Sequence, residues 1–444
     1  MTRINVKAIL ADADLRRKLM VSTIQATQAR EGIATTTEQA DRAYYVVSEG
    51  ERATFFDLER FKGGKGEPDR RHEMFVRTLT DGTERLRYDV ARRDFAAIDG
   101  CPLAFKRIGL VAHIFRECPS LEPTWADLRQ GLSTADDLRF VRHRWELPIN
   151  HIGQGKPWVP FAKGGDFSRF YQPFDLIVSW EDDGTEIKEY NSQLYGGGHW
   201  SRQVRSPGYY FRAGLTWPLR TQRGFNVRKM PAGCIFGHKG PGIFLRDPRD
   251  EDFVLGVMSS ALAEYILRGL MSFGSWEVGI VKRLPIPEPS ATRYRQISAL
   301  VRAIYDAKAA WDAGNEISTS FRNPWLLKED ATSPSPSLAA LLDLLKICEV
   351  REETHIRKLS DDLNEEIYRL YGIPDITRET IEETLGDRPA EIIWPQMERK
   401  ANDQKRMEHV WRLLSYATKR VLEADDDGIV PFNAVNGEPR LVER

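Results

Sequence analysis

The sequence predicts an α/β (α+β) fold in which a mixed sheet is flanked by N-terminal helices and followed by a C-terminal helical hairpin. Apolar residues recur at helical spacing near both ends of the chain, whereas strand-like runs rich in aromatic residues and glycine fill its middle. A proline-rich connector, RLPIPEPS (283–290), separates the two patterns. The length of 444 residues indicates about two to four structural units.

The first two hundred residues predict a helical segment followed by strands. Residues 4–32 are expected to be helical, because apolar residues recur there every three or four positions between charges. The runs RATFFDLERF (52–61) and EMFVRTL (73–79) are strand-like and are separated by a Gly-rich loop. FDLIVSWEDDGTEIKEY (174–190) has apolar alternation followed by an Asp-Asp-Gly turn and a second strand-like run, which predicts a β-hairpin.

The stretch that most resembles a membrane span is FVLGVMSSALAEYILRGLMSF (253–273). It contains Glu264 and Arg268, and charges near the middle of a spanning helix are costly. We interpret the stretch as a buried amphipathic helix.

The C-terminal part predicts two long helices. Apolar residues at helical spacing indicate a helix over 297–311. Between Ile356 and Leu370 the apolar steps alternate between three and four, which is coiled-coil spacing, and Gly372 and Pro374 end the pattern. The two helices are expected to pair as an antiparallel hairpin, and the acidic end of the tail is expected to be mobile.

Charge is distributed unevenly along a nearly neutral chain. There are 64 basic and 65 acidic residues, yet residues 190–246 contain no Asp or Glu and interleave arginines with Tyr, Phe and Trp. Lysine and arginine bind phosphates by releasing counterions, arginine and amide side chains read base edges, and aromatic rings stack on bases. Composition alone leaves two interpretations open, a basic loop-rich surface and a nucleic-acid groove.

Several kinds of site have no support in the sequence. The four cysteines form no CxxC pair, which favours structural thiols in a reducing cytoplasm over a zinc or redox site. The histidines lack HxxxH spacing. GGKG (63–66) lacks the Walker spacing, and RNPWL (322–326) has one proline where adenine N6-methyltransferases have two.

A nuclease is an alternative that a loose pattern permits. Asp175, followed by Glu186 and Lys188, matches an Asp and a Glu-x-Lys on neighbouring strands. The carboxylates would bind Mg²⁺ and the lysine would orient water. Ordinary charges on an exposed hairpin explain the same pattern.

A series of short motifs occurs in order along the chain. They are QGLSTADDLRFVRHRWE (130–146), KPWVPFAKGGDFSRFYQPFDLIVSWEDDGTEIK (156–188), YYFRAGLTW (209–217), VRKMPAGCIFGHKGPGIF (227–244), FVLGVMSSALAEYILRGL with SWEVGIVKRLPIP (253–287), and SDDLNEEIYRLYGI (360–373). Together they resemble the target-recognition half of PglX-type proteins of BREX phage-defence systems and of related type IIG restriction-modification enzymes.

The resemblance implies a role in DNA methylation and two departures from the family. The family joins this region to an N-terminal domain that methylates adenine N6 with S-adenosylmethionine. In this sequence, residues 51–69 and 87–108 resemble only the part of that domain beyond its catalytic loop, and the cofactor loop and the Asn-Pro-Pro-Tyr loop have no counterpart. The family's Asp-Asn after GLxT is Asp136-Asp137 here, which puts any DNA contact of that Asn in doubt.

We therefore expect a DNA-binding target-recognition subunit of a split adenine-N6 DNA methyltransferase in the cytoplasm, not an enzyme on its own. It would have no catalytic residue, cofactor or metal, and S-adenosylmethionine would bind a partner chain. The expected partners are double-stranded DNA and a separate methyltransferase chain or another defence-system protein, with no membrane. The alternatives are a magnesium-dependent endonuclease, a non-catalytic adaptor of a defence complex, and a degenerate remnant.

The expected DNA contacts come from the basic middle of the chain, while Trp217 and Phe225 are expected to pack in the core. The contacts are Lys163, Arg169, Arg202, Arg205, Arg212, Arg220, Gln222, Arg223, Asn226 and Arg228. The expected segments are a helical docking segment (1–46), a part resembling the end of a methyltransferase domain (47–130), a target-recognition domain (131–290), a helical spacer (291–373) and a helical, partly mobile tail (374–444).

Overall fold

The computed structural model describes residues 52–56, 68–81, 87–91, 105–271, 274–327, 337–425, 429–433 and 439–443. The chain divides into two compact units, Met1–His113 and Ile114–Arg444. The predicted helical segment 1–46 lies outside the described residues, as does part of the tail that is predicted to be mobile. The predicted five-segment division stays a prediction.

The first unit contains a two-stranded antiparallel sheet, β1 (Arg52–Phe56) with β2 (Arg87–Ala91), and helix α4 (Arg71–Asp81). The prediction of a strand at 73–79 is wrong, because this run lies inside α4. The helix begins after Asp69, whose carboxylate accepts the Arg71 backbone N–H at 3.0 Å, a typical N-terminal capping arrangement. Helix α6 (Phe105–Glu117) runs across the boundary between the units.

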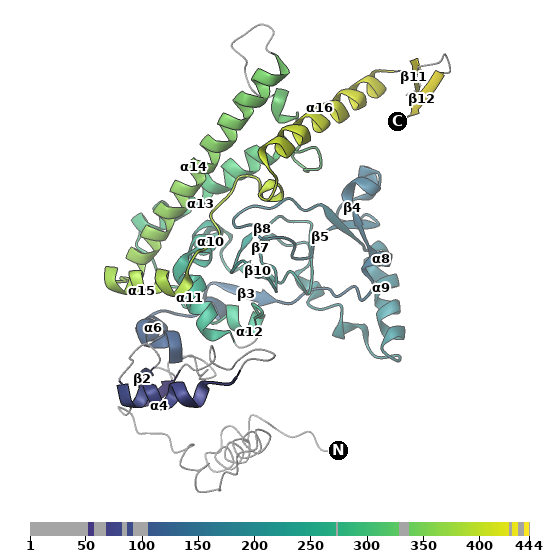
Figure 1. Cartoon of the computed structure of the whole chain (residues 1–444). Coiled ribbons are helices and arrows are strands. Elements are labelled where there is room, and N and C mark those ends of the chain that lie inside the picture. The colour runs from purple at the N-terminus through teal and green to yellow at the C-terminus, as the bar shows by residue number, and fades with distance from the viewer. Residues whose placement is uncertain are drawn as a thin grey trace. The chain divides into compact units, whose positions relative to one another are not determined.

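The second unit contains two four-stranded sheets, which confirms the predicted mixed α/β class. One is antiparallel, in the order β3 (Ala126–Arg129), β10 (Gly242–Leu245), β7 (Gly214–Thr216) and β8 (Arg228–Met230). The other is mixed, in the order β4 (Val141–His143), β6 (Leu176–Ser179), β5 (Trp158–Ala162) and β9 (Ile235–Phe236), with β9 parallel to β5. Figure 1 shows β7, β8 and β10 together at the centre of this unit.

Much of the acid-free run lies in these strands and in the core. Leu215, Ile235, Phe236 and Ile243 are fully buried, and so are the predicted core residues Trp217 and Phe225. Unpaired carboxylates are costly in such positions. Burial therefore explains part of the missing acidic charge, and only the exposed loops between the strands remain to be explained by function.

The predicted hairpin at 174–190 is wrong in its second half. Strand β6 is present, but the chain then enters helix α9 (Glu181–Leu194). Asp182, Asp183 and Gly184 adopt left-handed φ angles, and a Cβ on Gly184 would lie 2.6 Å from the Trp180 ring. This turn redirects the chain, and Ile187 and Asn191, one helical turn apart, are then both buried.

The predicted single helix at 253–273 is two helices. Helix α10 (Glu251–Ser259) ends at Ser260, whose hydroxyl accepts the Ala263 N–H at 3.1 Å and so caps α11 (Ala261–Leu270). The two are bent by 70°, and both are largely buried, as predicted. Among the described helices none is by itself long and apolar enough to cross a membrane. Only α10 and α11 taken together have the length and apolar composition of a membrane span, and they are bent.

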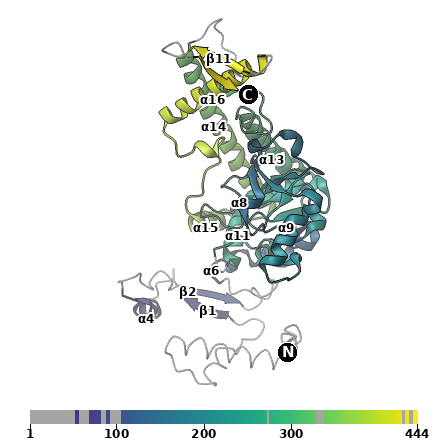
Figure 2. The same ribbon diagram turned by 90° about the vertical axis from the view of Figure 1, so that its right-hand side faces the viewer.

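The predicted helical hairpin is confirmed. Helix α13 (Ala291–Asp312) and helix α14 (Leu338–Leu370) lie side by side in both views (Figures 1 and 2). They are antiparallel, because Arg293 pairs with Glu366 at one end and Trp311 shares an apolar cluster with Leu345 at the other. Helix α14 ends before Gly372, as predicted.

The remaining elements of the second unit are short segments and the C-terminal helices and strands. They are α7 (Leu121–Thr124), α8 (Asp137–Phe140), α12 (Val278–Val281), α15 (Asp375–Leu385), α16 (Asn402–Ala424), β11 (Ile429–Asn433) and β12 (Pro439–Glu443), with short 3-10 turns such as η5 (Trp200–Arg202) and η9 (Pro395–Met397).

Candidate nucleic-acid interface

Three of the sequence motifs meet at the ends of the two sheets. They are Gly-Leu-Ser-Thr (131–134) after β3, Lys-Gly-Gly (163–165) after β5, and Gly-His-Lys-Gly (237–240) between β9 and β10. The His238 backbone N–H donates to the Leu132 carbonyl at 2.7 Å, which joins the first loop to the third. Loops far apart in the sequence thus form one surface.

Two glycines allow the second and third loops to touch. Gly164 has φ +112°, and a Cβ there would lie 2.7 Å from the Lys239 carbonyl oxygen. A Cβ on Gly240 would lie 2.4 Å from the Gly164 nitrogen. No side chain fits between backbones at these distances, so glycine is required at both positions. The close approach brings Lys163 and Lys239 to the same small cavity, of about 150 Å³.

Asp137 lines this cavity together with the two lysines. It forms an ion pair with Lys163 and accepts a hydrogen bond from the Thr134 hydroxyl at 2.5 Å. Partial burial acts to raise the pKa of Asp137, but the hydrogen bonds from Lys163 and Thr134 and the charges of Lys163 and Lys239 hold it below its ordinary value. Asp137 is therefore ionised at neutral pH.

His238 lies among three further cations. Partial burial lowers its pKa below the ordinary value, and the charges of Arg205, Lys239 and Arg220 lower it further, against the opposing effect of Glu277. The neutral imidazole is thus the dominant form at pH 7. We call Lys163, Arg205, Arg220, His238 and Lys239 the basic cluster.

The two arginines of the basic cluster are exposed and are held by neutral partners. Arg205 Nε donates to the Arg202 carbonyl at 2.8 Å, and its Nη1 donates to Gln130. Arg220 Nε donates to the Ser275 hydroxyl at 3.0 Å. In the part of the chain that the structure describes, neither guanidinium is paired with a carboxylate, so both charges are available to an anionic ligand.

Other predicted contacts are exposed but lie outside the basic cluster. Arg202 is in η5 and contributes its carbonyl to Arg205. Gln222 is exposed. Arg212 lies over the Tyr209 ring, 4.8 Å from its centroid, and the Tyr209 hydroxyl donates to Asp127 at 3.2 Å.

Three predicted DNA contacts need correction, because Arg169, Asn226 and Arg228 are buried. Arg228 donates to backbone carbonyls of the Lys-Gly-Gly loop and its neighbours, at 2.8 Å for Asp166. Burial lowers the pKa of Arg228 to about 9, against the charge of Asp166. These side chains hold the loop that carries Lys163 and do not reach solvent.

The other two buried residues are also occupied within the protein. Asn226 accepts the Ser168 backbone N–H at 3.2 Å. Arg169 forms an ion pair with Glu391 at 2.9 Å, with both side chains almost fully buried. Arg223, which is half-buried, is paired with Glu398. Paired charges such as these contribute little attraction for an external phosphate.

Sequence reasoning missed His238 and the role of Lys239. Both stand in Gly-His-Lys-Gly, and the signal that marks them is the pair of flanking glycines inside the acid-free run. Glycines on both sides of a polar pair are typical of a loop that packs closely against another backbone.

The residues proposed for a nuclease are not arranged as that alternative requires. Glu186 and Lys188 lie on helix α9 instead of a strand, and they pair with Arg139 and Asp183. Within the described residues there is no group of three or more His, Cys, Asp or Glu side chains placed to hold a metal ion.

The structure describes one of the two remaining motifs, RNPWL (322–326), and not the other, GGKG (63–66). Trp325 of RNPWL is buried and packs against Trp311 and Trp394. The GGKG loop (63–66) lies outside the described residues.

Comparisons with known proteins give distant matches. No family model matches the chain. It is 25% identical over 266 residues to the adenine-specific methyltransferase BrxX of Escherichia coli O9:H4 (strain HS), which covers 56% of this chain and 20% of that protein. It is 22% identical over 292 residues to the adenine-specific methyltransferase PglX of Lacticaseibacillus casei (strain Zhang), which covers 62% of this chain and 22% of that protein. The chain thus spans about a fifth of the length of these curated relatives.

Among solved structures, the type IIL restriction-modification enzyme MmeI in complex with DNA is similar over 61% of this chain and 37% of that one, with a TM-score of 0.37 and 13% identity. The predicted resemblance is confirmed as a partial and distant similarity to PglX and BrxX adenine-specific methyltransferases.

Proposed function

We propose that this chain binds double-stranded DNA through the basic cluster, as the target-recognition part of an adenine-N6 DNA methylation system. Methyl transfer would be catalysed by residues outside these 444, on a separate polypeptide that binds S-adenosylmethionine. The system would serve phage defence or restriction-modification.

The observation that carries this proposal is the composition of the basic cluster. Four permanent cations, Lys163, Arg205, Arg220 and Lys239, lie near two carboxylates, Asp137 and Glu277, which leaves an excess of positive charge. Cations that face solvent release counterions when they bind phosphate, and this supplies most of the sequence-independent affinity for DNA.

The buried and the exposed arginines of the acid-free run have different roles, and this difference supports the same function. Its buried arginine Arg228 shapes the Lys-Gly-Gly loop, and its exposed arginines Arg205 and Arg220 have no carboxylate partner in the described chain. A basic surface of ordinary kind would have interspersed acidic residues. The absence of acidic residues from the exposed loops of this run fits a surface that faces a polyanion.

The distant relatives support the link to adenine methylation. Both are named adenine-specific methyltransferases. This sequence has neither a glycine-rich cofactor loop nor an Asn-Pro-Pro-aromatic loop. Enzymes that modify a base must take it out of the stack. This chain would bind the duplex, and the separate chain would bind the extruded base.

The test compares two charge-reversed variants in duplex binding measured by fluorescence anisotropy. R205E/R220E removes two cations of the basic cluster. K419E/R420E makes the same change in net charge on helix α16, where both side chains are exposed. We expect the first variant to lose at least about tenfold in affinity and the second to bind like the unmodified chain. Equal affinity in all three proteins would favour an adaptor that does not bind DNA through this surface.

The assignment of methyl transfer to another polypeptide is tested separately by calorimetry with S-adenosylmethionine. We expect no binding at micromolar concentrations of the cofactor. Micromolar affinity would overturn this part of the proposal and leave DNA binding untouched.

A further inference from the structure

Helix α16 carries a line of exposed apolar side chains along one face. Met407, Trp411, Leu414 and Val421 are each between 50% and 63% exposed. Together with the exposed Thr418 they alternate steps of four and three residues, which is the spacing of a coiled-coil seam. We call these five residues the α16 stripe.

The opposite face of α16 is packed against the rest of its unit. His409 is buried, and Leu413 packs against the apolar cluster that contains Trp325 and Trp394. The helix therefore has two apolar faces, and the described chain covers one of them. An exposed apolar face on an otherwise packed helix is typical of a protein–protein contact.

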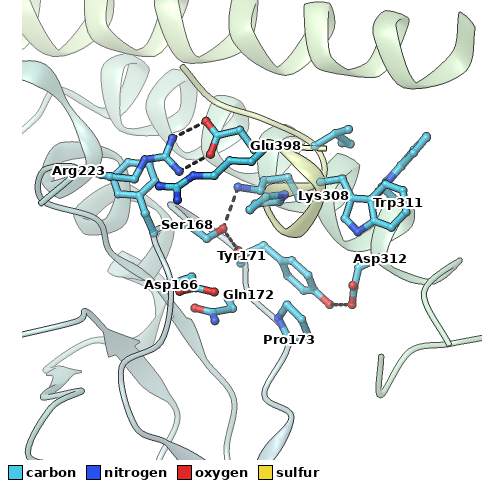
Figure 3. Close-up of a pocket in the computed structure, with 15 residues that line it drawn as sticks. Asp166, Ser168, Tyr171, Gln172, Pro173, Arg223, Lys308, Trp311, Asp312 and Glu398 are labelled. Carbon is cyan, nitrogen blue, oxygen red and sulfur yellow. Dashed lines mark hydrogen bonds and ion pairs between the residues drawn. The ribbon is translucent and has the colours of Figure 1, made fainter. Parts of the chain in front are cut away.

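The α16 stripe lies on an ordered support. The segment before the helix is fixed by the ion pair of Glu398 with Arg223 (Figure 3), and the helix itself by the ion pair of Arg406 with Asp343 of α14. In Figures 1 and 2, α16 extends away from the two four-stranded sheets toward β11 and β12. Because the surface is ordered before a partner binds, association loses little conformational entropy.

The exposed apolar surface continues onto helix α14. Ile347 and Val350 are exposed, and they lie on the same face of α14 as Asp343, one and two turns further along. Asp343 pairs with Arg406, the residue before Met407, so this face of α14 lies beside the start of the α16 stripe. An apolar surface that extends over two helices marks an interaction site better than scattered single side chains do.

Charge at the edge of the α16 stripe is complementary to itself. Glu408 lies near the start of the stripe and Lys419 near its end, on the same side of the helix. Their partners within the helix, Arg412 and Glu423, leave both side chains partly exposed. An antiparallel pair of α16 helices would bring Glu408 of each copy to Lys419 of the other. A parallel pair would bring each charge to its like.

The apolar side chains match in the same antiparallel arrangement. A two-fold axis between Trp411 and Leu414 places Trp411 of each copy against Leu414 of the other, and Met407 against Thr418. Trp411 would thus lie near the centre of the contact, where buried tryptophans contribute most to binding.

We propose that the α16 stripe is a homodimer interface, in which the α16 helices of two copies of this chain pair antiparallel. This inference is independent of the proposed function. One basic cluster can bind a short duplex without the dimer, so W411E should bind such a duplex like the unmodified chain, and the K419E/R420E control for DNA binding stays valid.

Sedimentation equilibrium of the full chain measures the association. We expect a reversible monomer–dimer equilibrium with a dissociation constant of about 1–30 micromolar. W411E places a charge at the centre of the contact and should weaken the dimer at least about tenfold. I376E is the matched control, because Ile376 is an exposed apolar residue of α15, outside the α16 stripe, and it should associate like the unmodified chain.

Two outcomes of this measurement would overturn the proposal. One is a chain that stays monomeric at about 200 micromolar, well above the expected dissociation constant, which would leave the α16 stripe to a different polypeptide. The other is a W411E variant that associates as tightly as the unmodified chain.

Exchange of the two charges tests the antiparallel orientation. E408K alone and K419E alone each place like charges opposite one another, and each should weaken the dimer about three- to tenfold. E408K/K419E restores opposite charges at both contacts and should associate more tightly than either single variant, although it carries the changes within the helix of both. A double variant that associates no better than the single ones would contradict the antiparallel pair.

Discussion

Arg223 donates from both terminal guanidinium nitrogens to the two carboxylate oxygens of Glu398, 175 positions further along the chain. The pair ties the basic loop after β7 to the segment that precedes helix α16. Arg220 is three residues away and has only the Ser275 hydroxyl as a side-chain partner in the described chain. Two arginines that look alike in the sequence therefore differ in the charge they offer to a ligand.

This difference gives a prediction for DNA binding. R220Q should weaken duplex binding several-fold, because it removes an available cation, whereas R223Q should change affinity less than about threefold, because its charge is already matched by Glu398. Anisotropy titrations at one salt concentration compare the two variants. An effect of R223Q as large as that of R220Q would mean that the pair opens when DNA binds.

The buried pairs of Glu391 with Lys308 and Arg169 should dominate a stability measurement. E391Q leaves two buried cations without a carboxylate and should lower the free energy of unfolding by about 3–5 kcal/mol. Urea denaturation measures the change. E398Q is the control, since it breaks a pair whose side chains are about a third exposed, and it should cost less than about 1 kcal/mol.

His238 should make DNA binding depend on pH. In the free protein burial and three neighbouring cations lower its pKa, so the imidazole is neutral at pH 7. A bound phosphate favours the protonated imidazole and raises the pKa, so binding takes up a proton and affinity should rise as pH falls from 7.5 to 6. Each unit of increase in pKa can contribute about tenfold. Anisotropy titrations across this pH range should show the slope in the unmodified chain and lack it in H238Q.

His409 should make stability depend on pH in the opposite sense. Burial, with a further contribution from Arg412, lowers its pKa to about 4, although Glu408 opposes this. The unfolded chain takes up a proton near pH 6.5 and the folded chain does so only near pH 4. The free energy of unfolding should therefore fall by about 3 kcal/mol as pH decreases through this window. H409Q should lack this part of the decrease in denaturation experiments at pH 7 and pH 4. The same decrease in both proteins would contradict the assignment.

The sequence predicted the elements whose pattern reflects packing alone. The α13–α14 hairpin followed from apolar spacing, and Trp217 and Phe225 were correctly expected in the core. The helix at 181–194 was mistaken for a strand, because Asp-Asp-Gly directly after an apolar strand is the usual signal of a hairpin turn. The left-handed turn at Asp182 to Gly184 against Trp180 decides the outcome in favour of the helix.

The candidate site was predictable only in outline. An arginine in an acid-free run has the same appearance whether its partner is solvent or a backbone carbonyl. Arg228 is buried because carbonyls of Gly164 and Asp166, more than sixty residues earlier, surround its guanidinium. Arg169 is buried because Glu391 reaches it from the far C-terminal part of the chain. Such long-range partners arise from tertiary structure and leave no local signal in the sequence.

The salt dependence of duplex binding tests the central claim most directly. Three cations of the basic cluster, Arg205, Arg220 and Lys239, have no ion pair in the described chain, whereas Lys163 is paired with Asp137. If these three meet phosphates, the logarithm of the association constant should fall against the logarithm of salt concentration with a slope of about −3. R205Q/R220Q removes two of these contacts and should reduce the steepness by about 2. The K419Q/R420Q control should keep the original slope. A slope that R205Q/R220Q leaves unchanged would contradict the assignment of the basic cluster as the DNA-binding surface.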